Sequence, residues 1–216
     1  MSKQLRAAIH RAIDALQAVK TYAFFQRVLS RDVRALYADK ITRAEFVDGL
    51  ADLLEQQMRR AWNEGMRANG RDPARDMTDE WESIFQELVV EQFAFVEQFA
   101  DAIVNGRLAE LGVDQFVARA DLWANNYTST VNTATLVTGF ADAGYAWRLG
   151  RTEEHCETCA ALNGIVATAE QWLEQAQAGI EPQGDALICG GWRCDCRIEI
   201  TDEPLTPGGI PSVPTQ

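Results

Sequence analysis

Apolar residues recur every three or four positions along the first part of the chain, which is the period of an amphipathic helix. Leu5, Ile9 and Ile13 begin this stripe, and Arg6 and Arg11 lie between them. We predict helix from residue 4 to about residue 68, either as one long helix or as a broken pair.

A capping box favours the broken pair. Thr42 and Glu45 have its spacing, in which the threonine hydroxyl accepts from the backbone of the third residue and the glutamate reaches back. A helix should therefore begin there and end near Asn69-Gly70. The next residues, through Pro73, have the composition of a turn.

A second helical block is expected from Asp79, whose spacing to Glu82 suits a helix N-cap. Asn105-Gly106 and Leu111-Gly112 punctuate this block, and a helical pattern resumes from Phe116 to about Arg148. The hydroxyl-rich run at 128–133 weakens that last prediction, because such residues are poor helix formers. The block carries a broad apolar stripe that must pack on another helix: Phe85, Leu88, Val89, Phe93, Val96, Phe99, Ala100 and Ile103.

From Gly150 onward the chain is richer in glycine, so strands and turns become plausible. Thr168 and Gln171 predict another capped helix, ending at Gly179. The expected fold class is mainly α: a helical body over residues 1–146, a small α+β module stapled by zinc over 147–200, and a disordered tail over 201–216, where prolines gather.

Net charge changes the picture, because the overall value of −12 is unevenly distributed. Residues 1–75 carry 14 Lys/Arg against 9 Asp/Glu, whereas residues 76–216 carry 6 against 23. The acidic part would repel nucleic acid, so DNA or RNA binding by this part is disfavoured. The basic N-terminal part could contact DNA or an acidic partner, although a solvated helix face explains it more simply.

All five cysteines lie within 41 residues, between Cys156 and Cys196. No apolar run is long enough to span a membrane and the first six residues lack the core of a signal peptide, so we expect synthesis in the cytoplasm and no membrane partner. In that reducing compartment, clustered cysteines are metal ligands more often than disulfides or unligated thiols.

Cys156-x-x-Cys159 is the firm half of a zinc site, because this turn brings two sulfurs to one ion. Three cysteines compete for the other half. Cys194 and Cys196 are the first choice, on one face of an alternating strand that must bend at Cys194. Cys189 is the strongest substitute or else a buried free thiol, with His155 behind it.

Enzymatic signatures are missing from the sequence. The chain has two histidines, and neither begins the H-x-E of a zinc deaminase or the H-E-x-x-H of a zinc hydrolase. A four-thiolate site also leaves no open coordination position, so we expect structural Zn²⁺ and no enzyme. The alternative is a zinc-containing enzyme or nucleic-acid-acting module, such as a nuclease or a nucleotide-modifying domain. It would use nearby arginines for phosphate: Arg148, Arg151, Arg193 and Arg197.

Two segments resemble the C-terminal module of minor head proteins of tailed bacteriophages, the Mu-type head morphogenesis family. The first runs from Trp147 to Gly164 (WRLGRTEEHCETCAALNG) and the second from Cys189 to Arg197 (CGGWRCDCR). In that family a tryptophan-led segment enters C-x-x-C and the module closes on C-R-C, often after His-Pro. Here Cys189 fits the place of the histidine, and Asp195 replaces the usual arginine.

The resemblance implies a minor capsid protein of the virion head. Such a protein is made in the bacterial host cytoplasm, binds the portal protein and other head proteins, and acts in head morphogenesis or DNA packaging. The resemblance is specific over residues 147–200 and only general over the helical part.

Overall fold

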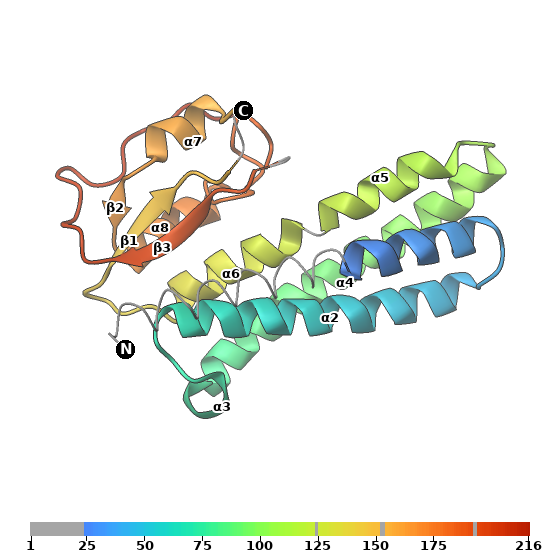
Figure 1. Cartoon of the computed structure of the whole chain (residues 1–216), viewed down its shortest axis with the longest axis horizontal. Coiled ribbons are helices and arrows are strands. Elements are labelled where there is room, and N and C mark those ends of the chain that lie inside the picture. Colours follow the sequence, from blue (N-terminus) through green and yellow to red (C-terminus); the bar gives the residue numbers. More distant parts are fainter. Residues whose placement is uncertain (1–23, 124, 152–153, 192–193) are drawn as a thin grey trace, which may run out of the picture. The chain divides into compact units, whose positions relative to one another are not determined.

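The computed structural model describes residues 24–123, 125–151, 154–191 and 194–216 (Figure 1). It confirms the expected fold class: the chain is mainly helical, with a small antiparallel sheet and a cysteine cluster late in the sequence. The apolar stripe predicted before residue 24 lies outside the described residues.

The chain forms two compact units that do not follow the boundary expected at residue 147. One contains the described residues of Met1–Gln57 and Phe93–Ala124, and the other those of Met58–Gln92 and Asn125–Gln216. The residues around the cysteines thus belong with helical segments from the middle of the chain.

The first unit is helical. Its buried side chains include Phe46 and Phe99, whose ring centroids lie 6.1 Å apart. Arg43 pairs with Asp101 at 2.5 Å on its surface. The unit is built from residues 24–37, the first part of α2 (Arg43–Ala68), the last part of α4 (Asp79–Leu108) and α5 (Val113–Trp123).

The predicted capping box starts α2. The Thr42 amide donates to the Glu45 carboxylate at 2.8 Å, and the Glu45 amide donates to the Thr42 hydroxyl at 3.2 Å. At the other end, Gly70, two residues after the last residue of α2, takes a φ of +72°. The predicted turn then contains a short helix, α3 (Pro73–Asp76), capped by Asp72.

Helix α4 begins at Asp79, as predicted, but Thr78 is the residue that caps it. The Thr78 hydroxyl accepts from the Trp81 amide at 3.2 Å. The predicted interruption at Gly106 is wrong, because α4 continues to Leu108. A Cβ on Gly106 would lie 2.1 Å from the ring of Phe116, so this glycine allows close helix packing instead.

Helix α6 (Asn125–Val137) contains the hydroxyl-rich run that weakened the helix prediction. Thr133 donates to Ser129 O at 3.1 Å and Thr135 donates to Val131 O at 2.8 Å, so these hydroxyls bond within the helix. These hydrogen bonds to backbone carbonyls one turn earlier satisfy hydroxyl groups whose side chains are partly or wholly buried.

The sheet has the strand order β2-β1-β3, with both pairs antiparallel. Its strands are β1 (Gly144–Arg148), β2 (Val166–Ala167) and β3 (Arg197–Thr201). The prediction of helix through Arg148 is therefore wrong. Four of the five residues of β1 are buried, and a strand covered on both faces lacks the alternation that reveals a strand in sequence.

Two further helices, α7 (Glu157–Leu162) and α8 (Ala169–Gln177), complete the second unit. The predicted capping box of Thr168 and Gln171 starts α8. Trp172 of α8 donates from its indole to Tyr145 O at 2.7 Å, which holds α8 against β1.

Tyr145 also ties the sheet to the end of α2. Its hydroxyl donates to Asn69 Oδ1 at 3.0 Å and accepts from the Phe140 amide at 2.9 Å. The Asn69 amide donates to Thr135 O at 2.7 Å and to the Thr138 hydroxyl at 3.1 Å. This buried network joins strand, loop and two helices within the second unit.

Residues 202–216 lack regular structure, as their composition predicts, yet they bond to the second unit instead of extending as a disordered tail. The Thr206 amide donates to Val166 O at 2.8 Å, and the Gln216 amide donates to Ala186 O at 3.1 Å. Proline and glycine prevent regular pairing here, but several backbone groups still find partners.

Candidate metal centre

The C-x-x-C turn is built at the start of α7. Cys156 is the N-cap of this helix, and its sulfur accepts from the Cys159 amide at 3.5 Å. An N-cap side chain turns back over the first turn of its helix, so the two sulfurs share one side. Cys159 is 1% exposed and belongs to the core cluster that contains Trp147 and Trp172.

Cys189 lies in the loop between α8 and β3, just before two glycines. Gly190 and Gly191 have φ values of +60° and +72°. A Cβ on Gly191 would lie 2.1 Å from Gln183 O, so the loop can close only with glycine at this position. Gly191 therefore allows a close approach between this loop and the backbone of Gln183.

Cys194 and Cys196 precede β3, which begins at Arg197, so neither sulfur is carried by the regular strand. Gln183 holds this segment: its side-chain amide donates to Cys194 O and to Cys196 O, both at 2.9 Å. Asn132 of α6 donates to Gln183 Oε1 at 3.3 Å and accepts from the Ile198 amide at 2.9 Å. These hydrogen bonds hold the segment in the bend that would let the sulfurs of Cys194 and Cys196 bind one ion.

Asp195, between these two cysteines, holds the segment that leaves β1. Its carboxylate accepts from the Arg151 amide at 2.5 Å. A Cβ on Gly150 would lie 2.0 Å from the Asp195 carboxylate, so glycine is needed at this contact as well. The Asp195 carboxylate thus has a structural role, because it holds the backbone at Arg151.

The five thiols converge as two groups that share Cys159. The sulfurs of Cys156, Cys159 and Cys189 lie within 4.8 Å of one another, and so do those of Cys159, Cys194 and Cys196. All five cysteines are free thiols. The cluster of all five can bind a metal ion, and the set expected first, without Cys189, is not one of these groups.

His155 lies beside the second group, with Nδ1 3.9 Å from Cys196 Sγ. The sulfurs of Cys159 and Cys194 are 3.8 Å apart. Two sulfurs bound to one tetrahedral Zn²⁺ at about 2.3 Å would be separated by about 3.8 Å. The chemistry of the donors also fits, because thiolate and imidazole are ligands that suit zinc.

The thiols influence one another's ionisation. Side-chain hydrogen bonds from Cys159 and then Cys196 lower the pKa of Cys194 to about 2. Hydrogen bonds to Cys194 and Cys196, with burial, raise the pKa of Cys159 far above its usual range. One thiolate in this group is thus stabilised by neighbours that keep their protons. A bound dication would ionise the coordinating thiols as well.

Thr158, inside the C-x-x-C turn, joins the two halves of the cluster. Its hydroxyl donates to Pro214 O at 2.6 Å and accepts from the Ile188 amide at 3.3 Å, next to Cys189. The Gln216 side chain donates to Leu187 O at 3.0 Å in the same loop. The last residues therefore brace both elements that supply thiols.

Sequence reasoning missed three positioning residues: Asn132, Thr158 and Gln183. Thr158 could have been suspected from its place between the two cysteines of the C-x-x-C turn. Asn132 and Gln183 carry no local signal, because their partners lie 11 to 66 residues away.

Two of the arginines that an enzyme would need for phosphate, Arg148 and Arg197, are engaged with acids. Arg148 lies 2.6 Å from Glu203 and 4.0 Å from Glu199, and Arg197 lies 2.5 Å from Glu199. Arg193 lies outside the described residues, and Arg151 is exposed. Pairing of this kind weakens the nuclease alternative.

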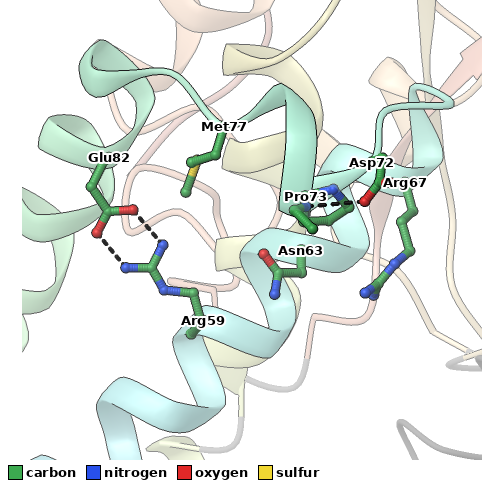
Figure 2. A pocket seen from close by; sticks show the side chains of 8 residues that line it. Arg59, Asn63, Arg67, Asp72, Pro73, Met77 and Glu82 are labelled. Atoms are coloured by element: carbon green, nitrogen blue, oxygen red, sulfur yellow. Dashed lines mark hydrogen bonds and ion pairs between the residues drawn. The ribbon is translucent and has the colours of Figure 1, made fainter.

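A hollow of about 470 Å³ opens beside α3, away from the cysteines in sequence. Figure 2 shows Arg59 directed at Glu82, to which both of its terminal nitrogens donate. The guanidinium also lies 3.7 Å from the centroid of the Phe85 ring. This arginine is committed within the protein, and the remaining lining includes both Arg67 and Asp72, so we assign no ligand here.

No helix in the described part of the chain is both long and apolar enough to cross a membrane. In comparisons with known proteins, no family model matches the chain, and no curated protein or solved structure is significantly similar to it.

Proposed function

We propose that this chain is a minor head protein of a tailed bacteriophage or prophage, acting structurally in head morphogenesis and DNA packaging at the portal vertex. The observation that carries the proposal is the meeting of the two resembling segments. Trp147–Gly164 and Cys189–Arg197 are separated by 24 residues in sequence, and their thiols come together in one cluster.

A structural use of that cluster is supported by its surroundings. Cys159 and Cys196 are 1% and 0% exposed and pack in the same core as Trp147, Trp172 and Ile198. A metal at this position would hold together two loops with little regular structure of their own. Structural zinc contributes on the order of 10 kcal/mol of apparent folding free energy in small domains.

The proposed partner is the portal protein, contacted through the helical part of the chain. The described arginines in this part include several engaged in ion pairs on the protein's own surface, such as Arg34 with Asp114 and Arg43 with Asp101. This pairing favours docking on a protein surface over DNA binding, which needs cations available for phosphates.

Co-purification with the portal protein of the same phage tests the proposal. Full-length chain co-expressed with that portal protein should elute with the portal ring, at the ring's size, and should be present in purified heads. A matched control is an unrelated acidic protein of similar size, which should elute alone.

Loss of the chain from the phage gives the decisive measurement. Heads assembled without it should package much less DNA or lose infectivity. Fully infectious particles that never contain the chain would overturn the proposal, whatever metal the isolated protein binds.

A further inference from the structure

The arrangement of the five sulfurs is not that of a single tetrahedral site. One Zn²⁺ with four thiolates has four sulfurs, and six short sulfur–sulfur separations link those same four atoms. Here the short separations link five sulfurs as two triangles. One triangle contains Cys156 and Cys189, the other contains Cys194 and Cys196, and both contain Cys159.

Two triangles that meet at one corner are the pattern of two tetrahedral ions sharing a ligand. Each ion takes three sulfurs, and the shared thiolate contacts both. Cys159 occupies the shared corner, and it is the most buried sulfur of the first triangle. A thiolate has more than one lone pair, so one sulfur can bind two soft ions.

A further donor stands beside the second triangle. His155 Nδ1 lies 3.9 Å from Cys196 Sγ, which is close to the separation of two ligands on one tetrahedral ion. The ring would complete four ligands there: three thiolates and one imidazole. The first triangle supplies three thiolates, so a water molecule would occupy the fourth coordination position of the ion bound there.

Each triangle has its own supporting contacts. Gln183 holds the backbone of Cys194 and Cys196 from one side. Thr158 links the C-x-x-C turn to the residue before Cys189 from the other. Neither support depends on the other, so the two triangles can each be held in place.

We propose that the cysteine cluster binds two zinc ions, bridged by the thiolate of Cys159. The proposal rests on the structural zinc proposed above and changes its number and arrangement. On binding, each thiol that is still protonated releases its proton to the buffer, and no electron is transferred. Two dications with five thiolates leave one net negative charge, whereas one dication with four thiolates leaves two. The smaller charge is easier to hold in a partly buried, acidic region.

Native mass spectrometry of the full-length chain, loaded with Zn²⁺ and then freed of loosely bound metal, tests the number directly. We expect two ions per chain, and two cadmium resonances in ¹¹³Cd NMR of the cadmium-loaded protein. One ion per chain would overturn the two-ion arrangement and leave the structural zinc standing. No bound ion would overturn both, and neither result bears on co-purification with the portal protein.

Substitutions then distinguish the triangles. Cys189→Ser and Cys196→Ser should each leave one tightly bound ion and a single cadmium resonance, whereas Cys159→Ser should weaken both. His155→Asn should weaken one ion by about tenfold or more. His10→Asn, which changes the other histidine of the chain, is the matched control and should retain two ions. If Cys196→Ser still bound two ions as tightly as the native chain, the assignment would be overturned even where other variants fail to fold.

Discussion

The C-x-x-C turn and the loop that carries Cys189, Cys194 and Cys196 supply thiols to the same cluster, but they are built differently. In the turn, the N-cap geometry of a six-residue helix positions both sulfurs, so the information is local. In the loop, Gln183, Asn132 and a glycine with positive φ do this work across longer separations. The sulfur positions of the turn are set by contacts close in sequence, whereas those of the loop depend on residues far away in sequence.

Removal of the metal should affect both halves and has the largest expected effect. We predict that chelation, or Cys159→Ser, which removes the thiolate shared by both groups, abolishes cooperative unfolding of the second unit around the cysteines, a loss on the order of 10 kcal/mol of apparent stability. Hydrogen exchange should show loss of protection in β1, β3 and α8, with the helices of the first unit largely protected. Unchanged melting of the metal-free chain would contradict this.

A substitution at Gly191, where the loop lies against the backbone of Gln183, should have the next largest effect on stability. Gly191→Ala places a Cβ against Gln183 O and forces a non-glycine residue to a φ of +72°, so we expect a loss of about 3 kcal/mol in the free energy of unfolding. Gly164→Ala is the matched control. It has a φ of +80° with no atom within 4 Å of the added Cβ, so about 1 kcal/mol is expected from denaturant melts. Equal losses would show that the close approach is unimportant.

The same loop contains an acid whose burial, with the nearby charge of Asp185, raises its pKa: Glu181, to about 7. The folded state then binds more protons than the unfolded state between about pH 4.5 and 7, so this residue's contribution to stability falls as pH rises through that window. Glu181→Gln should therefore stabilise the protein by about 2 kcal/mol at pH 8 and by little at pH 4.5.

Thermal melts of variant and native protein across this pH range measure that difference. Glu174→Gln, at an exposed position on α8, is the control and should give a small offset that does not depend on pH. A constant offset for Glu181→Gln as well would contradict the prediction.

The Gln183 side chain itself should have a smaller effect on stability and a measurable one on the metal. Gln183→Glu removes the donor to Cys194 O and Cys196 O and sets a carboxylate against these carbonyls. We expect a loss of about 1–2 kcal/mol in stability and about tenfold weaker zinc binding, measured by chelator competition. Gln177→Glu, an exposed residue at the end of α8, should change neither.

The same contrast between local and distant information decides what could be predicted from sequence. The capping boxes at Thr42 and Thr168 were found because their partners lie three residues away. The C-x-x-C pair was recognised for the same reason, because its two cysteines are three residues apart. Strand β1 was mistaken for helix because its pairing with β2 and β3, and its burial, are tertiary features with no local pattern.

The composition of the last residues correctly predicted that they form no helix or strand. It did not predict that hydrogen bonds hold them against the second unit. Prolines and glycines there do prevent strand or helix. The contacts that hold these residues, from Thr158 to Pro214 and from Gln216 to Leu187, join positions 29 to 56 residues apart. Likewise, no pattern in the sequence could indicate that Cys159 belongs to two groups of sulfurs, because that depends on where two distant loops meet.

The buried hydrogen bond from the Tyr145 hydroxyl to Asn69 determines how much of the chain must accompany the cysteine region if it is moved into another protein. A piece of chain cut before Trp147 would lose three residues of the central strand, and one cut before β1 would still lose Asn69, the buried acceptor of the tyrosine hydroxyl. Such a piece would leave polar groups unpaired in its interior, at a cost of about 1–3 kcal/mol each. The unit that could be moved intact, in evolution or in a laboratory graft, is the cysteine region together with α6 and the end of α2, and not the motif alone.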